Sequence, residues 1–397
     1  MAFRHSFYRS AVGLCLLMTI QAAPPAKQVK VSMTNDRWTT VAGNVEFLEH
    51  MGNPSIELKP GNFAQHIASG QAVLKGLTFR TGTIEYDVDA AAGMGAGFAF
   101  RRSNNDNYEE VYLRPQPKCD QAPGCIQYTP QSHGVLMWDL FPQYQSPAPL
   151  RQGEWNHVKL VISSRRMNIF INGAQKPTLK VGRLEGDNEE GGLMLQGPGI
   201  FSNLTVTPDA RENLPGNPEK DATASDRRYI RDWQISPFSK LAVDQIPSAA
   251  NLPASGAAWM HLEAERNGLL NASRIYGLPF PRPERGVVWM KTKIRSSNQQ
   301  QKHVSIGWAR EIWVFVNGQQ VFANKNLYMP KEARKEPDGR LSLQNGSFLM
   351  PLKAGDNEVA VAIANNFYGW GLMMHFDHLK GLHLLGHDNL PLAALAK

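Results

Sequence analysis

The chain has 397 residues, a length that excludes a single small module and allows more than one hydrophobic core. Apolar residues make up 42% and charged residues 19%, so the composition is that of a globular protein and excludes disordered, collagen-like and coiled-coil chains. The net charge of +7 permits an anionic partner, but positive and negative residues alternate and form no concentrated basic run. The sequence therefore predicts no nucleic-acid partner.

Residues 1–22 have the layout of a secretory signal peptide. Two arginines precede an apolar stretch over 11–20, and small residues follow it. This stretch is shorter than the roughly 20 residues that span a bilayer. We therefore expect a periplasmic or secreted protein with no membrane span in the mature chain.

Two cysteines remain once the predicted signal peptide is removed. Cys119 and Cys125 bracket a short polar loop that contains proline and glycine. In an oxidising compartment such a pair is expected to form a disulfide. A zinc site is not expected, because no second pair of cysteines or histidines lies nearby to complete the ligand shell.

From about residue 30 the chain consists of short alternating segments separated by turn residues, which predicts an all-β fold. In residues 82–90, Ile84, Tyr86 and Val88 alternate with carboxylates, a pattern typical of a half-buried strand. Similar segments follow up to the pair Asn172–Gly173, which is a strong hairpin turn signal. An antiparallel β-sandwich over residues 30–208 is the expected outcome.

Residues 209–227 are rich in charge and proline and almost free of large apolar side chains, which indicates a linker. Strand-like segments resume over 228–386, so we expect a second β-sandwich, followed by a tail over 387–397. Because the linker is short and polar, relative motion of the two sandwiches is the default expectation.

Three runs stand out: TFRTGTIEYDVDAAAGMGAGFAFRR, GEWNHVKLVISSRRMNIFINGAQ and FSNLTVTP. Together they resemble the concanavalin A-like lectin/glucanase superfamily, in particular its laminin-G-like modules. The later run EIWVFVNGQQVF, with MPLKAGDNEVAVAIANNFYGWGLMMHF, resembles the galactose-binding-like jelly rolls of exported glycosidases and esterases. The two resemblances cover about residues 30–208 and 228–386 and imply two antiparallel jelly-roll domains. Both superfamilies contain binding modules and enzymes alike.

A row of carboxylates offers one enzymatic hypothesis. Glucanases of the lectin-like superfamily carry Glu-x-Asp-x-Glu on one strand, and Glu85, Asp87 and Asp89 are similar to this motif at the first two positions. The resemblance implies Glu85 as nucleophile and leaves the shorter Asp89 at the general-acid position. Residues four apart on a strand are about 13 Å apart at Cα, whereas a retaining mechanism needs carboxyl groups about 5–5.5 Å apart. The alternative interpretation is an ordinary solvated strand face. A further enzymatic alternative, by fold analogy alone, is a resemblance to 3-keto-glycoside hydrolases.

Sugar sites combine flat aromatic rings with polar side chains that hydrogen-bond the hydroxyls. In the second unit the Gly-flanked turn NNFYGWG supplies Asn366, Tyr368 and Trp370, and Trp308 in SIGWAR is similar. Loops at the end of a sandwich are where such sites form. The alternative is that these rings close the end of the core.

The first unit has a second group of this composition. Arg101, Tyr112 and the neighbouring Tyr108 and Glu110 lie on two predicted adjacent strands, and Trp138 follows the disulfide loop. The alternative here is ordinary cross-strand pairing.

The sequence predicts no cofactor and no catalytic metal. Four histidines near the C-terminus, the last of them His387, are interpreted as solvated positions. The Asn/Asp-rich turns at 103–107 and 355–357 could hold a structural calcium ion, but such turns are common without metal.

Three functions are compatible with these residues. The first is an exported carbohydrate-binding protein that recognises a glycan or glycoconjugate through loop aromatics. The second is a glycoside-processing hydrolase with its site on the first sandwich. The third is an adhesion module that contacts a protein partner through the same aromatic loops.

Overall fold

The computed structural model describes residues 27–62, 65, 67–91, 93, 95–278 and 284–385. The predicted signal peptide and the tail over 387–397 lie outside these residues. Within them the predicted all-β class is confirmed, because the strands form four sheets with antiparallel pairing. Across the part of the chain that is described, no helix has the length and apolar character needed to cross a membrane.

The first sandwich consists of two sheets. The first sheet has the order β14 (Leu179–Val181), β13 (Met167–Ile171), β12 (Asn156–Ile162), β6 (Gly82–Ala90), β16 (Gly199–Pro208), β4 (Asn53–Leu58), β3 (Val45–His50), with β1 (Val29–Lys30) beside β16. The second has the order β10 (Val135–Leu136), β9 (Ile126–Ser132), β8 (Asn107–Leu113), β7 (Ala96–Asn104), β15 (Gly192–Gln196), β5 (Gln71–Leu74), β2 (Trp38–Ala42), with β11 (Gln145–Ser146) beside β9.

Strand alternation sets the core of this sandwich. Ile84, Tyr86 and Val88 of β6 are at most 1% exposed, whereas the carboxylates between them point outward. Tyr86 stacks on Phe98 of the facing sheet, with ring centroids 4.6 Å apart. The two inner faces therefore share one apolar layer, as the period-2 pattern predicts.

The second sandwich also has two sheets. The larger has the order β19 (Met260–Glu263), β17 (Asp232–Ile235), β21 (Arg285–Ser296), β26 (Gly355–Asn365), β23 (Arg310–Val316), β24 (Gln319–Asn326), with β18 (Ser239–Leu241) and β28 (Leu382–Leu385) beside β21. The smaller has the order β20 (Leu270–Asn271), β27 (Gly371–Phe376), β22 (Gln300–Trp308), β25 (Gly346–Leu352). Short helical turns connect them: α1 (Ser273–Tyr276), η2 (Ala249–Asn251), η3 (Arg266–Gly268), η4 (Lys331–Ala333) and η5 (Leu343–Asn345).

The Asn-Gly pairs at 172–173 and 317–318 form tight turns. Asn172 and Gly173 take φ of 51° and 73° between β13 and β14, and Asn317 and Gly318 take 50° and 78° between β23 and β24. Positive φ at both central residues matches the right-handed twist of the flanking strands. Asparagine and glycine tolerate this conformation better than other residues, so the chain turns at these pairs; Asn317–Gly318 connects β23 directly to β24, whereas β14 begins only at Leu179.

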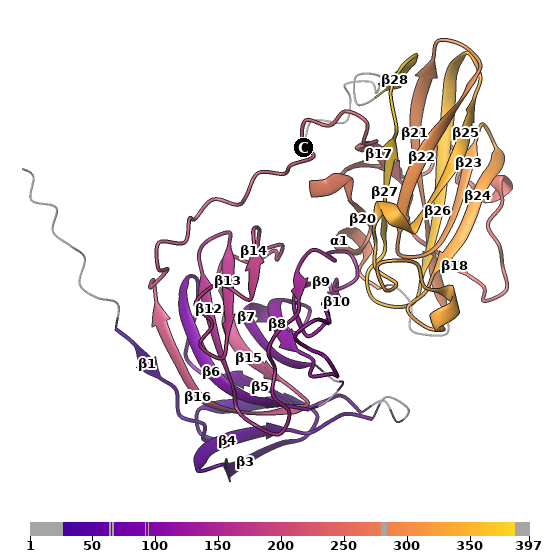
Figure 1. Cartoon of the computed structure of the whole chain (residues 1–397). Helices are drawn as coiled ribbons and strands as arrows, with labels where there is room; N and C mark the ends of the chain where they lie inside the picture. The colour runs from indigo at the N-terminus through magenta and orange to yellow at the C-terminus, as the bar shows by residue number, and fades with distance from the viewer. Residues whose placement is uncertain are drawn as a thin grey trace, which may run out of the picture.

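In Figure 1, α1 and β20 of the second sandwich face the β9–β10 end of the first. Hydrogen bonds and ion pairs join the two sandwiches. Arg274 of α1 pairs with Asp187 of the first sandwich at 2.7 Å, and the backbone N–H of Leu341 donates to the carbonyl of Asp139 at 2.8 Å. The intervening segment is also held, because Ser163 Oγ donates to the Pro215 carbonyl at 2.7 Å. The polar linker composition gave no indication of these contacts.

The predicted disulfide is confirmed. Cys119 and Cys125 are bonded, with their Cα atoms 5.5 Å apart. The bond closes the loop between β8 and β9.

Candidate functional site

The outer face of the second sheet carries an unusual set of polar and aromatic side chains. On β8, Val111 and Leu113 face the core, so Tyr108, Glu110 and Tyr112 face away from it. All three are nevertheless at most 6% exposed. Something other than the core of the first sandwich therefore covers this outer face.

Part of the cover comes from the second sandwich, whereas Tyr108 packs against Ala99 and Met194 of its own sheet. A cavity of about 380 Å³ lies over the outer face of the sheet. Its lining from the first sandwich includes Glu110, Tyr112, Arg114, Leu136, Trp138 and Gln196, and its lining from the second is Tyr328, Phe367 and Tyr368. We call it the junction cavity, because both sandwiches contribute to its wall.

Glu110 is the buried carboxyl group of the junction cavity. It is 2% exposed, and its Oε2 atom has no hydrogen-bond partner. Gly97 on the neighbouring strand β7 leaves room for it, since a Cβ there would lie 1.7 Å from Oε1 of Glu110. Burial raises the pKa of Glu110 to about 8. At neutral pH the group is therefore a neutral carboxylic acid, which can donate a hydrogen bond or a proton.

Polar groups next to Glu110 form a short chain of hydrogen bonds. Tyr112 donates its hydroxyl to Oε1 of Gln127 at 2.7 Å and accepts from Nη2 of Arg114 at 3.1 Å. Gln127 in turn donates to the backbone carbonyl of Trp138 at 2.8 Å. These bonds fix the orientation of the tyrosine and place a guanidinium group at the cavity wall.

Aromatic rings from both sandwiches meet at Trp138. Its ring makes edge-to-face contacts with Tyr328 and Tyr368, at centroid distances of 5.0 and 5.8 Å. The guanidinium of Arg340 lies 5.0 Å from the Trp138 centroid. The result is a wall of aromatic faces and edges beside the neutral carboxyl group.

The residue after Trp138 holds the two sandwiches together at this point. Asp139 is fully buried and accepts hydrogen bonds from Nη2 of Arg310 and, at 3.2 Å, from the backbone N–H of Gly369. Arg310 also donates from Nε to the Phe367 carbonyl at 2.6 Å. Burial raises the pKa of Asp139 to about 6, against the opposing effect of the Arg310 charge. This ion pair fixes the β26–β27 loop, whose residues Phe367 and Tyr368 line the cavity.

The structure brings together three of the residues predicted to bind a ligand. Tyr112, Trp138 and Tyr368, from distant parts of the sequence, all line the junction cavity. Asn366 lines a neighbouring cavity of about 270 Å³, which shares Tyr328 and Phe367 with the junction cavity.

The other three predicted binding residues lie in the interior. Trp308 and Trp370 are fully buried, and Trp370 Nε1 donates to the Gly277 carbonyl at 2.9 Å. Arg101 is 2% exposed and pairs with Glu109 at 3.1 Å. These side chains close the cores, and no ring face of the two tryptophans is available for stacking.

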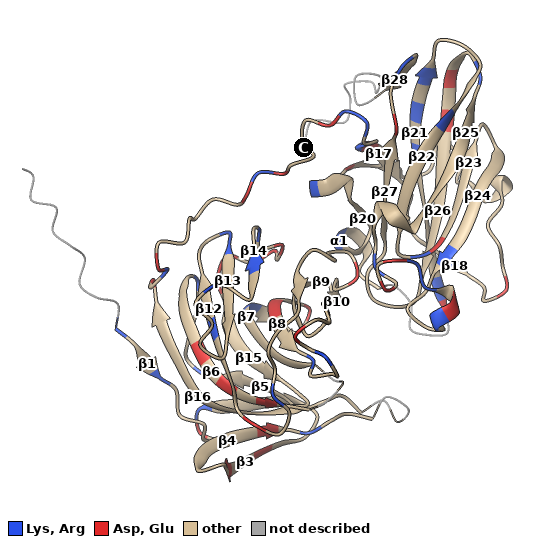
Figure 2. Ribbon diagram, in the orientation of Figure 1, with Lys and Arg blue, Asp and Glu red and all other residues tan. Residues whose placement is uncertain are grey.

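The carboxylate row lies on the outer face of the other sheet of the first sandwich, away from the junction cavity. Figure 2 shows the acidic positions of β6 between β12 and β16. His157 contacts Asp87 at 2.8 Å and Glu85 at 3.3 Å, and His50 contacts Asp89 at 3.1 Å. The hydrogen bonds with His157 and Asn203 hold the pKa of Asp87 below its usual value, although burial opposes them. Asp87 is thus stabilised as a carboxylate that already has partners.

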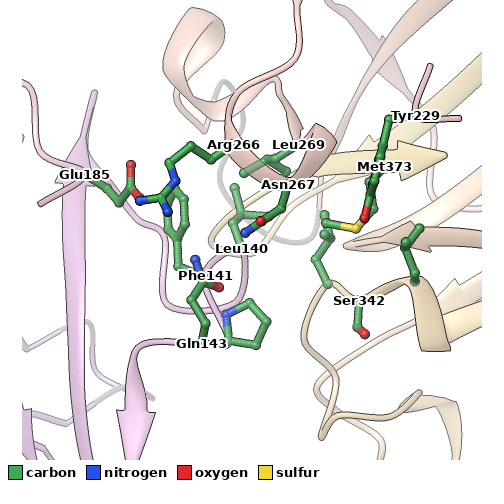
Figure 3. Close-up of a pocket in the computed structure, with 13 residues that line it drawn as sticks. Leu140, Phe141, Gln143, Glu185, Tyr229, Arg266, Asn267, Leu269, Ser342 and Met373 are labelled. Carbon is green, nitrogen blue, oxygen red and sulfur yellow. The ribbon is translucent and has the colours of Figure 1, made fainter. Parts of the chain in front are cut away.

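A third cavity, of about 240 Å³, lies elsewhere between the sandwiches. Figure 3 shows Arg266 extending from the second sandwich toward Glu185 of the first, above Phe141. The Glu185 carboxylate already accepts from the Tyr144 hydroxyl at 2.8 Å and pairs with Arg183 at 3.3 Å. Leucine, phenylalanine and methionine make up six of the thirteen residues that line this cavity, and Glu185 is the only carboxyl group among these described residues.

Sequence reasoning missed part of the site. Tyr328 and Phe367 were not among the predicted binding residues, and Glu110 was considered only as a polar partner for sugar hydroxyls. The alternation on β8 could have shown that Glu110 and Tyr112 share a face, but the cover from the second sandwich has no local sequence signal.

Metal ligation was considered for the histidines near the C-terminus. Among the described residues, no group of three or more His, Cys, Asp or Glu side chains is arranged to hold a metal ion. His375 contacts Asp226 at 3.2 Å, and His387 lies outside the described residues. Calcium at the two Asn/Asp-rich turns stays an expectation from the sequence.

The fold and the junction cavity define a two-sandwich all-β protein with a ligand-sized site between its sandwiches. No protein-family model matches the chain, and no curated protein matches it. Among solved structures, carbohydrate-binding module CBM66 from Bacillus subtilis is 15% identical, with a TM-score of 0.29 over 43% of this chain and 90% of that one.

Two further solved structures have similar scores. Domain 4 of AbnA, a GH43 extracellular arabinanase from Geobacillus stearothermophilus, is 11% identical, with a TM-score of 0.32 over 47% of this chain and 94% of that one. SCLam, a non-specific endo-beta-1,3(4)-glucanase from family GH16, is 12% identical, with a TM-score of 0.31 over 47% of this chain and 92% of that one. The function proposed below is argued from the residues of the site.

Proposed function

We propose that the protein is an exported carbohydrate-binding protein and that the junction cavity is its glycan site. The observation that carries this proposal is the convergence of Tyr112, Trp138 and Tyr368 on one cavity that also holds the buried Glu110. Three segments far apart in the sequence supply these side chains. Such convergence is expected of a binding site and is not required to close either core.

The chemistry of the wall suits a saccharide. Aromatic rings stack against the apolar faces of pyranose rings, and the Arg114 guanidinium and the Glu110 carboxylic acid offer hydrogen-bond donors to hydroxyl groups. The volume of about 380 Å³ lies within the range of about 300–1,000 Å³ for small-ligand pockets. A glycan end or a short segment of a glycan chain fits this description.

Hydrolysis is the second candidate, and Glu110 favours it. A carboxyl group with a pKa near 8 remains protonated at neutral pH and can act as a general acid. Glycosidases of the common type, however, use two carboxyl groups about 5–9.5 Å apart. Glu110 is the only carboxyl group among the described residues that line the junction cavity. Binding is therefore the function that the site supports better.

The test is a glycan-array screen of the mature chain, residues 24–397, with each bound glycan recovered and examined by mass spectrometry. Under the binding proposal, glycans are recovered intact, Trp138→Ala loses the signal, and Glu110→Gln keeps it because an amide also donates a hydrogen bond. Release of a cleaved product that is lost in Glu110→Gln would establish hydrolysis instead.

Glu85→Gln is the matched control, because Glu85 lies on the outer face of the opposite sheet. It is expected to change neither binding nor product formation. Loss of either in this variant would move the site to the carboxylate row and contradict the junction cavity.

A further inference from the structure

A second cavity adjoins the junction cavity at the end of the second sandwich. It has a volume of about 270 Å³ and shares Tyr328 and Phe367 with the junction cavity as a common wall. We call it the side cavity. We call Tyr328 and Phe367, together with the neighbouring Tyr368, the aromatic ridge between the two cavities.

The aromatic ridge reaches the surface of the protein. Tyr368 lines the junction cavity and is nevertheless 37% exposed. Met329 follows Tyr328 in the chain, lines the side cavity and is 64% exposed. Each cavity therefore has an exposed side chain in its wall next to the ridge. A ligand can extend from one cavity to the other across the ridge without entering a core.

The rings of the ridge are held in fixed positions. Tyr368 takes a φ of 56°, in the left-handed region that tyrosine rarely adopts, and its ring packs edge-to-face against Phe367 with centroids 4.4 Å apart. The guanidinium groups of Arg310 and Arg334 lie 5.0 Å and 4.2 Å from the ring centroids of Phe367 and Tyr328. Strained backbone positions are concentrated at binding sites, and rings that are already ordered lose little entropy when a ligand stacks on them.

The side cavity suits an uncharged sugar unit. Its two buried arginines, Arg285 and Arg310, pair with the buried carboxylates Glu311 and Asp139, so their charges are already matched. Asn366 adds an amide to the lining. An amide both donates and accepts hydrogen bonds, as a sugar hydroxyl also does. The wall therefore combines aromatic rings with a neutral polar group, which is the composition expected of a sugar subsite.

We propose that the ligand is an oligosaccharide of at least two sugar units, whose chain crosses the aromatic ridge and places its second unit in the side cavity. This inference rests on the proposed function and deepens it, because it states the minimum length of the glycan. A monosaccharide in the junction cavity would make no use of the side cavity. The affinity should therefore rise with chain length until both cavities are filled.

The test measures affinity against chain length by isothermal titration calorimetry of the mature chain. The probes are linear, uncharged oligosaccharides of one to six units in four series: β-1,4-linked glucose, xylose and mannose, and β-1,3-linked glucose. In at least one series we expect the affinity to rise about tenfold or more above that of the monosaccharide and then to level off. This measurement uses the wild-type protein and does not depend on a variant folding correctly.

Two variants assign the increase to the ridge and the side cavity. Asn366→Ala removes the amide from the side cavity. Tyr368→Asn removes the exposed ring, and asparagine adopts positive φ more readily than most residues, so the loop can keep its backbone conformation. Each variant should lower the ratio of oligosaccharide to monosaccharide affinity about threefold or more, the effect of one lost hydrogen bond or ring contact.

Asn298→Ala is the matched control for Asn366→Ala. Asn298 is exposed in the turn between β21 and β22, whereas the side cavity lies at the opposite end of β21, where Arg285 begins the strand. This control should keep the full increase of affinity with chain length.

Equal affinity of monosaccharide and longer chains in every series that binds would overturn the inference and leave glycan binding intact. An increase that Asn366→Ala leaves as large as Asn298→Ala does would place the second sugar unit elsewhere, and it would also overturn the inference. Failure of all four series to bind would overturn the inference, and failure of every glycan on the array would overturn the proposed function as well.

Discussion

The Glu110→Gln variant should become more stable relative to the wild type as the pH rises. In the folded chain the pKa of Glu110 is raised by burial from 4.5 to about 8. The folded state therefore retains a proton that the unfolded state releases, and stability falls with rising pH across this window. The part of the unfolding free energy that depends on protonated Glu110 is fully present below pH 4.5 and is lost as the pH rises to about 8.

The size of the effect follows from the pKa difference. Each pKa unit corresponds to about 1.4 kcal/mol, so burial of Glu110 costs about 3 kcal/mol at pH 7 and about 4 kcal/mol at pH 8. Because Glu110 is 2% exposed, solvent screening reduces this cost little. Glutamine has no proton to release, so the Glu110→Gln variant lacks this pH dependence.

Urea denaturation at pH 5 and pH 8, followed by far-UV circular dichroism, measures the difference. The gain in unfolding free energy of Glu110→Gln over the wild type should grow by about 3 kcal/mol between these pH values. The neighbouring Glu109→Gln is the contrasting variant, because it leaves the buried Arg101 without its counter-charge. Burial raises the pKa of Glu109 as well, so this variant is compared with the wild type at pH 8 only, where it should be destabilised by about 3–5 kcal/mol. A Glu110→Gln effect of equal size at pH 5 and pH 8 would refute the reasoning about Glu110.

Three further variants test the geometry of the junction cavity. Trp138→Ala should lower glycan affinity by about 1–3 kcal/mol in calorimetry, since the central aromatic ring is removed; unchanged affinity would place the site elsewhere. Gly97→Ala should lower thermal stability by about 1–3 kcal/mol and weaken glycan binding, because the new methyl group displaces the Glu110 carboxyl group. Asp139→Asn should lower stability by about 3 kcal/mol in thermal denaturation and also reduce glycan affinity, because Arg310 loses its buried counter-charge. Normal affinity in a destabilised Asp139→Asn protein would show that the ion pair does not hold the cavity in place.

The sequence alone was sufficient for most of the fold. Period-2 alternation predicted the buried face of β6, and the pair Asn172–Gly173 marked a turn that has the expected positive φ. These features are local, because strand faces and hairpin turns depend on residues that are neighbours in the sequence.

The site was predictable only in part, because local composition does not show whether a side chain is buried in a core or lines a cavity. Trp138, Trp308 and Trp370 lie in similar mixtures of glycine, aromatic and polar residues. Only Trp138 lines the junction cavity, while the other two are fully buried. What separates them is the position of each ring relative to both sandwiches, and no local pattern encodes that position.

Ligand binding and the docking of the two sandwiches must be coupled in this arrangement. Trp138 lines the cavity, and the next residue, Asp139, holds the β26–β27 loop through Arg310. A glycan that contacts both Trp138 and Tyr368 can make these contacts only when the sandwiches are docked. By linkage, the free energy by which docking improves glycan affinity equals the free energy by which the glycan stabilises docking. Separating the sandwiches removes one wall of the site, so either sandwich alone should bind the glycan more weakly than the intact chain.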